Sequence, residues 1–193
     1  MKKILALLLV LLLVFSAAAC GKTPAPSKVL DEILKEIKKT DYTKEAELAE
    51  IMEALGAENT KEFVSLFTDF DYEILDEEIN DDTATVTVKI TTYNFGQMFI
   101  EAVQEYILQV FSIAFSNPDI TEEELVEILQ DIFTDKISKM EKNFTQTIDV
   151  GFTLTDEGWV LDYELYESEL FDAILGGMIK AIDEFADSLN QVQ

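Results

Sequence analysis

Apolar residues recur at helical spacing along much of the chain, with polar residues between them. Steps of three and four residues place side chains on one face of a helix, so each such run predicts an amphipathic helix. The last predicted helix contains Gly176-Gly177, a pair that indicates close packing, a kink or a hinge. Asn59 with Glu62 and Thr121 with Glu124 have the spacing of capping boxes. The predicted helices cover about residues 27–39 (capped by Ser27), 44–55, 59–67, 121–142 and 168–189.

In other segments the hydrophobic period is two, which is typical of half-buried strands. The clearest segment is 83–91, where apolar residues at even positions alternate with threonines and Lys89. The other predicted strands are 72–74, 144–155 and 159–165, and turns at 80–82 and 156–158 join the four into two hairpins. The sequence therefore predicts an α+β fold in the order ααα-ββ-αα-ββ-α. One antiparallel sheet of about four strands would be covered by helices.

The segment Gln97–Phe115 is apolar almost all round. A helix of this kind is normally buried centrally, and we predict that position for it. A membrane span is the alternative, but Glu101, Gln104, Glu105 and Gln109 within the segment make it unfavourable.

The N-terminus has the layout of a secretory signal. Lys2 and Lys3 precede an unbroken apolar run at 4–15, and small residues at 16–19 precede Cys20, the chain's one cysteine. Ala17-Ala18-Ala19-Cys20 resembles a bacterial lipobox, which implies cleavage before Cys20 and a diacylglycerol on its thiol. An uncleaved membrane helix, or an ordinary signal that leaves a free thiol, would be the alternatives.

The lipobox resemblance sets the expected organisation of the chain. Residues 1–19 would be a cleaved signal peptide, 20–28 a lipidated tether with two prolines, and 29–193 a single α+β domain. The protein would sit on the outer face of the cell membrane, held by the lipid on Cys20.

Charge restricts the partners that the chain can bind. Loss of Lys2 and Lys3 with the signal leaves 12 lysines against 39 acidic residues, a net charge of −27. Such a chain cannot replace the counterions on phosphates, so we predict no nucleic-acid partner. The charge serves solubility, or else attracts a basic peptide, a polyamine or a divalent cation.

Missing residue types restrict the chemistry. The chain has no histidine and no arginine. Catalytic triads, Cys-His pairs and the common zinc sites are therefore excluded, and any catalysis would use carboxylates, Tyr, Ser or Lys. We predict no cofactor.

Three segments resemble nuclear-transport-factor-like (cystatin-like) α+β domains, as found in small lipoproteins of Gram-positive bacteria. The segments are VLDEILKEIKKTDYTKEAELAEIM at 29–52, DDTATVTVKITTY at 81–93 and TDEGWVLDY at 155–163. The inserted helical pair at 97–142 departs from the compact form of that fold. The resemblance implies a fold that hosts binding modules, isomerases and dehydratases, so it does not determine function.

The leading interpretation is a non-catalytic binding or interaction module for a small hydrophobic ligand or a protein. Its candidate pocket residues are aromatic, and they would otherwise be core. They are Tyr93, Phe99, Tyr106, Phe152, Trp159 and Tyr163.

Two alternatives use carboxylates. An isomerase or dehydratase of the same fold would need an Asp or Glu base with a Tyr donor, but Asp149, Asp162 and Glu164 alternate away from Phe152 and Trp159. A divalent-cation site could use Asp76, Glu78, Asp81 and Asp82, which otherwise form a solvated acidic turn.

Overall fold

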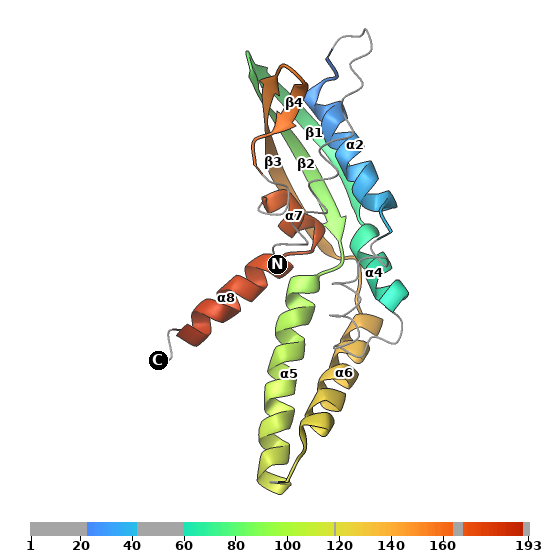
Figure 1. Cartoon of the computed structure of the whole chain (residues 1–193), viewed down its shortest axis with the longest axis vertical. Helices are drawn as coiled ribbons and strands as arrows, with labels where there is room; N and C mark the ends of the chain where they lie inside the picture. Colours follow the sequence, from blue (N-terminus) through green and yellow to red (C-terminus); the bar gives the residue numbers. More distant parts are fainter. Residues whose placement is uncertain (1–22, 42–59, 118, 164–167, 191–193) are drawn as a thin grey trace. The chain divides into compact units, whose positions relative to one another are not determined.

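The computed structural model describes residues 23–41, 60–117, 119–163 and 168–190, with the backbone alone at 60–63. Its architecture confirms the predicted α+β class, with one four-stranded antiparallel sheet in the order β1-β2-β3-β4 (Figure 1). The signal peptide, Cys20 and the helix predicted at 44–55 lie outside the described residues. The elements are α2 (Pro26–Lys39), α4 (Thr60–Thr68), β1 (Asp71–Asn80), β2 (Thr83–Thr92), α5 (Phe95–Ser116), α6 (Glu122–Ser138), β3 (Phe144–Thr155), β4 (Gly158–Leu161), α7 (Glu169–Ile174) and α8 (Met178–Asn190).

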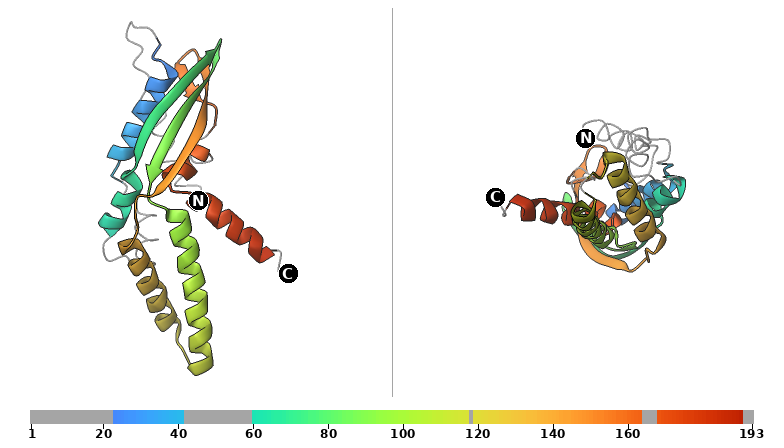
Figure 2. Two further views of the ribbon diagram at one scale, coloured as in Figure 1. Left: turned by 180° about the vertical axis from the view of Figure 1, so that it is seen from behind. Right: turned by 90° about the horizontal axis from the view of Figure 1, so that it is seen from below.

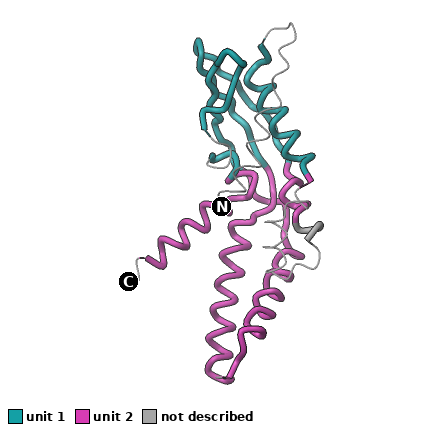
Figure 3. The backbone as a smooth tube through the Cα atoms, in the orientation of Figure 1, with its two compact units in different colours: residues 1–40, 71–90, 146–171 teal, residues 41–70, 91–145, 172–193 magenta. Residues whose placement is uncertain are grey.

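The chain divides into two compact units, which are described separately (Figure 3). Unit 1 comprises residues 1–40, 71–90 and 146–171 and holds α2 and most of the sheet; unit 2 comprises residues 41–70, 91–145 and 172–193 and holds α4, α5, α6 and α8.

Alternation along the strands builds the core of unit 1. Ala84, Val86, Val88 and Ile90 are at most 5% exposed, as the period of two predicts. On β3, the side chains of Ile148, Val150 and Phe152 are buried in the same way. Asp81 takes a φ of 55° in the two-residue turn before β2, a conformation that aspartate tolerates better than most residues.

Helix α2 packs against β1 and β4 through one apolar face. Leu30, Leu34 and Ile37 on that face are buried. The helix begins at Pro26 and not behind a Ser27 cap, so residues 26–28 of the predicted tether are helical. The Ser27 backbone N–H donates instead to the Glu77 carboxylate at 2.7 Å, which places a negative charge at the positive end of the helix.

A hydrogen-bonded pair also links α2 to β1. The Tyr72 hydroxyl donates to Asp31 at 2.7 Å, and Lys35 lies 2.6 Å from the same carboxylate. Burial, and then the hydrogen bond to Asp31, raise the pKa of Tyr72 to about 12. The hydrogen bond from Lys35, and then that from Tyr72, lower the pKa of Asp31.

We expect this pair to make stability depend on alkaline pH. The folded pKa of Tyr72 lies above its unfolded value of about 10. Its contribution is therefore complete below that value and lost as pH rises through about 12. Between about pH 10 and about pH 12, the melting temperature of the wild type should fall further than that of Tyr72→Phe. Superimposable melting profiles of the two proteins over this range would contradict the assignment.

The last predicted helix is wrong as a single element, because the chain breaks into α7 and α8. Gly176 and Gly177 take φ values of 55° and 76°, in the left-handed region that ends helices. The Gly96 backbone N–H donates to the Gly176 carbonyl at 3.0 Å. The glycine pair thus joins α8 to the start of α5 within unit 2.

Candidate interaction surface

The second half of α5 carries an exposed apolar surface. Ile107, Leu108, Phe111 and Phe115 are 40%, 71%, 63% and 90% exposed. Their spacing of three and four residues places them on one side of the helix, and we call these four residues the distal face. The predicted central burial of this helix is therefore wrong for its second half.

The first half of α5 is anchored, which explains why the distal face is left uncovered. Phe95, Met98 and Ala102 form a buried cluster with Ile132 of α6, and Phe67 stacks on Phe95 at a centroid distance of 4.6 Å. On another side of α5, Phe99 makes an edge contact with Phe185 of α8. Both α6 and α8 contact α5, and α5 and α6 run side by side as a helical hairpin (Figures 1 and 2). In the described part of the chain, the buried residues of α5 all lie in its first half, and the large apolar residues farther along the helix stay exposed.

The turn of this hairpin is strongly acidic. Thr121 and Glu124 form the predicted capping box, since the Thr121 side chain accepts from the Glu124 N–H and the Glu124 carboxylate accepts from Thr121. These hydrogen bonds lower the pKa of Glu124 and keep it ionised. Glu122 and Glu123 share the same helical turn, where negative charge is favourable.

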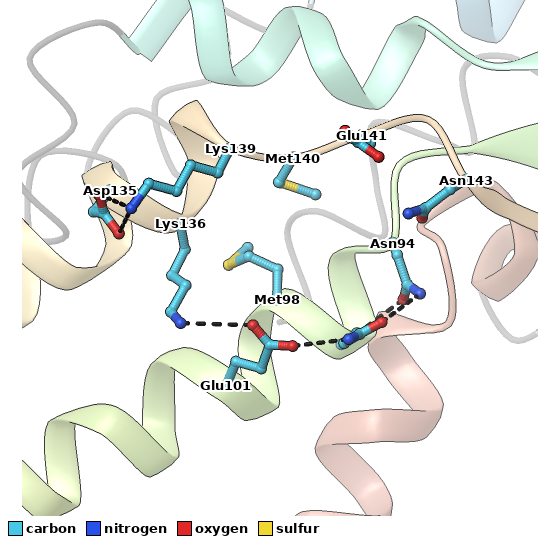
Figure 4. Close-up of a pocket in the computed structure, with 10 residues that line it drawn as sticks. Asn94, Met98, Glu101, Asp135, Lys136, Lys139, Met140, Glu141 and Asn143 are labelled. Atoms are coloured by element: carbon cyan, nitrogen blue, oxygen red, sulfur yellow. Dashed lines mark hydrogen bonds and ion pairs between the residues drawn. The ribbon is translucent and has the colours of Figure 1, made fainter.

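A polar hollow of about 260 Å³ lies at the base of the hairpin (Figure 4). Lys136 extends across it to Glu105 at 3.0 Å and Glu101 at 3.5 Å. The hydrogen bond to Glu105, the largest cause, raises the pKa of Lys136. This amine stays protonated and cannot act as a general base near neutral pH.

The other polar groups of the hollow are largely bonded to one another. Asn94 donates to Gln97 at 3.1 Å, and Gln97 donates to Glu101 at 2.8 Å. Lys139 pairs with Asp135 at 2.6 Å. These pairs stay within one helix and its cap residues, while the ion pairs of Lys136 with Glu101 and Glu105 cross from α6 to α5 and hold the two helices together. The polar lining of the hollow therefore has a structural explanation. Its lining contains none of the six aromatic residues that the sequence indicated.

Three of those aromatic residues lie in unit 2. Tyr93 donates to Asp69 at 2.9 Å and lies 6.1 Å from the Phe95 ring. Phe99 contacts Phe185, and Tyr106 packs against the buried cluster of α5 and α6. All three side chains are half-buried, and each packs against residues of unit 2.

The other three lie in unit 1. Phe152 is fully buried in the sheet core. Trp159 is half-buried and pairs with Leu154 across β3 and β4. Tyr163 is half-buried as well, and burial raises its pKa. The six residues are thus divided between the two units, and a hydrophobic ligand site at these residues stays a prediction.

The carboxylates considered for catalysis are exposed on the sheet. Asp149 accepts from Thr87 at 2.7 Å, and Asp162 accepts from Thr153 at 2.6 Å. Both act as surface partners of threonines, while Glu164 lies outside the described residues.

The acidic turn between β1 and β2 is also exposed. Asp81 and Asp82 form this turn, whereas Asp76 and Glu78 lie on β1 and not in the turn that the sequence predicted. All four side chains face solvent, and Asp76 accepts from the N–H of Glu77. Among the described residues, no group of three or more acidic side chains is arranged to hold a metal ion. The cation site predicted there gains no support from the geometry.

Length and composition would allow one described helix, α5, to cross a membrane, with 11% of its most apolar stretch buried. The anchored first half and its ion pairs to Lys136 are typical of a helix folded against other protein.

Comparison with known proteins gives little further guidance. No family model matches the chain, and no curated protein matches it. Among solved structures, it is similar to the predicted lipoprotein ycdA from Bacillus subtilis, with a TM-score of 0.40 and 15% identity. The match covers 76% of this chain and 46% of that one, so the chain spans less than half of its length. The function is therefore argued from the residues of this chain.

Proposed function

We propose that this protein is a lipid-anchored, non-catalytic interaction module on the outer face of the cell membrane. The distal face of α5 would contact another protein. The observation that carries this proposal is the exposure of Phe115 and Leu108, 90% and 71%, beside Phe111 at 63%. Large contiguous apolar patches are rare on monomeric proteins and mark interaction sites.

The form of this surface favours a protein over a small molecule. Small-molecule sites are concave and enclose most of the ligand. The distal face lies along the outside of a helix and is built from long apolar side chains, as in helix-to-helix recognition. Phenylalanine is one of the residues that are enriched in protein interfaces relative to the rest of the surface.

The anchor part of the proposal is supported by the sequence at 1–20. Two acyl chains at about 0.8 kcal/mol per buried methylene hold a protein stably on a bilayer, whereas one chain is marginal. A molecule held in this way meets its partners in two dimensions, which raises their effective concentration.

Protection of a thiol beside the distal face tests the contact in cells. Lipidation of Cys20 would leave the mature wild-type chain without a free thiol, because it has one cysteine. Ala114→Cys keeps all four distal-face residues, and Thr134→Cys places a control thiol at an exposed position of α6. With a membrane-impermeant maleimide on intact cells, we expect Ala114→Cys to react about tenfold more slowly than Thr134→Cys, since interface cores exclude water.

Both thiols should react at equal rates once the cells are solubilised and the protein is diluted. Equal rates on intact cells as well would show that the distal face is uncovered, and the proposed contact would then be wrong.

A further inference from the structure

We infer that the partner of the distal face is a second copy of this chain, with the two α5 helices antiparallel about a two-fold axis at Phe111. This inference rests on the proposed function and names its partner. Three features of α5 support it: the absence of charge, the placement of the apolar residues about Phe111, and the exposed area.

Charge is absent from the distal half of α5. The stretch 106–118 has no charged residue, although 27% of the chain is charged. Depletion of charge is typical of interface cores. At a net charge of −27 for the mature chain, two copies can approach closely only through a surface that carries no carboxylate. The uncharged stretch is such a surface.

The distal face is nearly symmetric about Phe111. Ile107 and Phe115 each lie four residues from it, so an antiparallel pair centred there places Ile107 of one copy opposite Phe115 of the other. Phe111 then meets its own equivalent, and Leu108 lies opposite Ala114. An isologous two-fold contact requires this self-complementarity.

The acidic hairpin turn selects the antiparallel arrangement. Asp119 and Glu122 to Glu124 gather at one end of the hairpin. A parallel pair would bring both acidic ends together, whereas an antiparallel pair centred on Phe111 separates the two Asp119 positions by roughly 24 Å along the helix axis. The same carboxylates disfavour insertion of this end into a bilayer.

The exposed area approaches that of a specific contact. At 63% and 90% exposure, Phe111 and Phe115 are mostly open to solvent. They present roughly 300 Å² per copy, because an aromatic side chain covers 150–250 Å². Pairing would bury roughly 600 Å² in total from Phe111 and Phe115 of the two copies. The rest of the face and its polar neighbours raise this toward the ~1,000 Å² of a biological interface.

Disulfide cross-linking of the full-length lipoprotein in membranes tests the inference. In the pair, the thiols of Phe111→Cys meet at the axis, while those of Gln104→Cys lie roughly 21 Å apart along the helix. A disulfide needs Cα atoms within about 7 Å. After mild oxidation we expect a cross-linked dimer from Phe111→Cys and not from Gln104→Cys. Adding Phe115→Glu should abolish it, because charge then enters the apolar contact.

Salt provides a second readout. The dimer yield should rise when salt increases from about 0.05 M to about 0.5 M, since screening weakens the repulsion between two acidic copies. A yield that falls with salt would overturn the apolar self-contact.

Each other outcome overturns the inference in a distinguishable way. Equal cross-linking at positions 104 and 111 would show a parallel or random encounter. No cross-link at either position, with Ala114→Cys still protected from maleimide, would show that a different protein covers the face and that the proposed function survives. No cross-link and no protection would refute both.

Discussion

Replacement of Gly176 by alanine should lower the free energy of unfolding by roughly 3–5 kcal/mol. A Cβ atom at this position would lie 1.9 Å from the Tyr93 carbonyl oxygen and 2.9 Å from the Phe95 nitrogen. Both are backbone atoms at the start of α5, so they cannot rotate away as a side chain would. The φ of 55° adds strain that glycine avoids. Urea unfolding measures the loss as a lower midpoint.

Gly158→Ala is the matched control for backbone strain without a clash. Gly158 also has a positive φ, 114°, but the nearest atom to its Cβ position is the Thr23 methyl carbon at 3.7 Å. We expect a loss of about 1–2 kcal/mol from strain alone. If the two variants unfold at the same urea concentration, the close approach of Gly176 to α5 does not limit stability.

Cys20→Ala should transfer nearly all of the protein from the membrane fraction to the medium, or leave it as an unprocessed precursor. The reason is that a folded domain with a net charge of −27 has no electrostatic attraction to anionic lipid, so the acyl chains alone would retain it. Fractionation of cells followed by mass measurement of the processed N-terminus distinguishes the two forms.

The control restores a thiol at a different position. Cys20→Ala combined with Ser27→Cys returns one cysteine to the chain, but outside the small-residue stretch. It should behave like Cys20→Ala, because modification depends on the position after Ala17-Ala18-Ala19. A processed Cys20→Ala protein that stays on the membrane would instead show that the anchor lies elsewhere.

Elements with a local cause were predictable from the chain alone. The alternation at 83–91 became β2 with Ala84, Val86, Val88 and Ile90 buried. Thr121 and Glu124 formed their predicted capping box. Side-chain period and capping depend on residues a few positions apart, so the sequence by itself determined the α+β class and most elements.

The end of the chain shows where local reasoning failed. Gly176-Gly177 was recognised, but its effect depends on Gly96, which lies 80 positions earlier. A Cβ at Gly96 would lie 2.6 Å from the Gly177 carbonyl oxygen. The glycine pair by itself indicated close packing or a kink, which the structure confirms, but the pattern of apolar residues could not identify Gly96 as the partner.

The candidate interaction surface depended on tertiary structure in the same way. An apolar stretch such as 97–115 predicts that its side chains are buried, but it does not identify the element that covers them. In the fold, α6 and α8 cover the first half of α5, where Met98 and Ala102 are buried, and Phe115 is left 90% exposed. The chain alone determined that α5 is apolar. Only the tertiary structure decided which of its residues are core and which are available to a partner, because burial depends on neighbours that are distant in sequence.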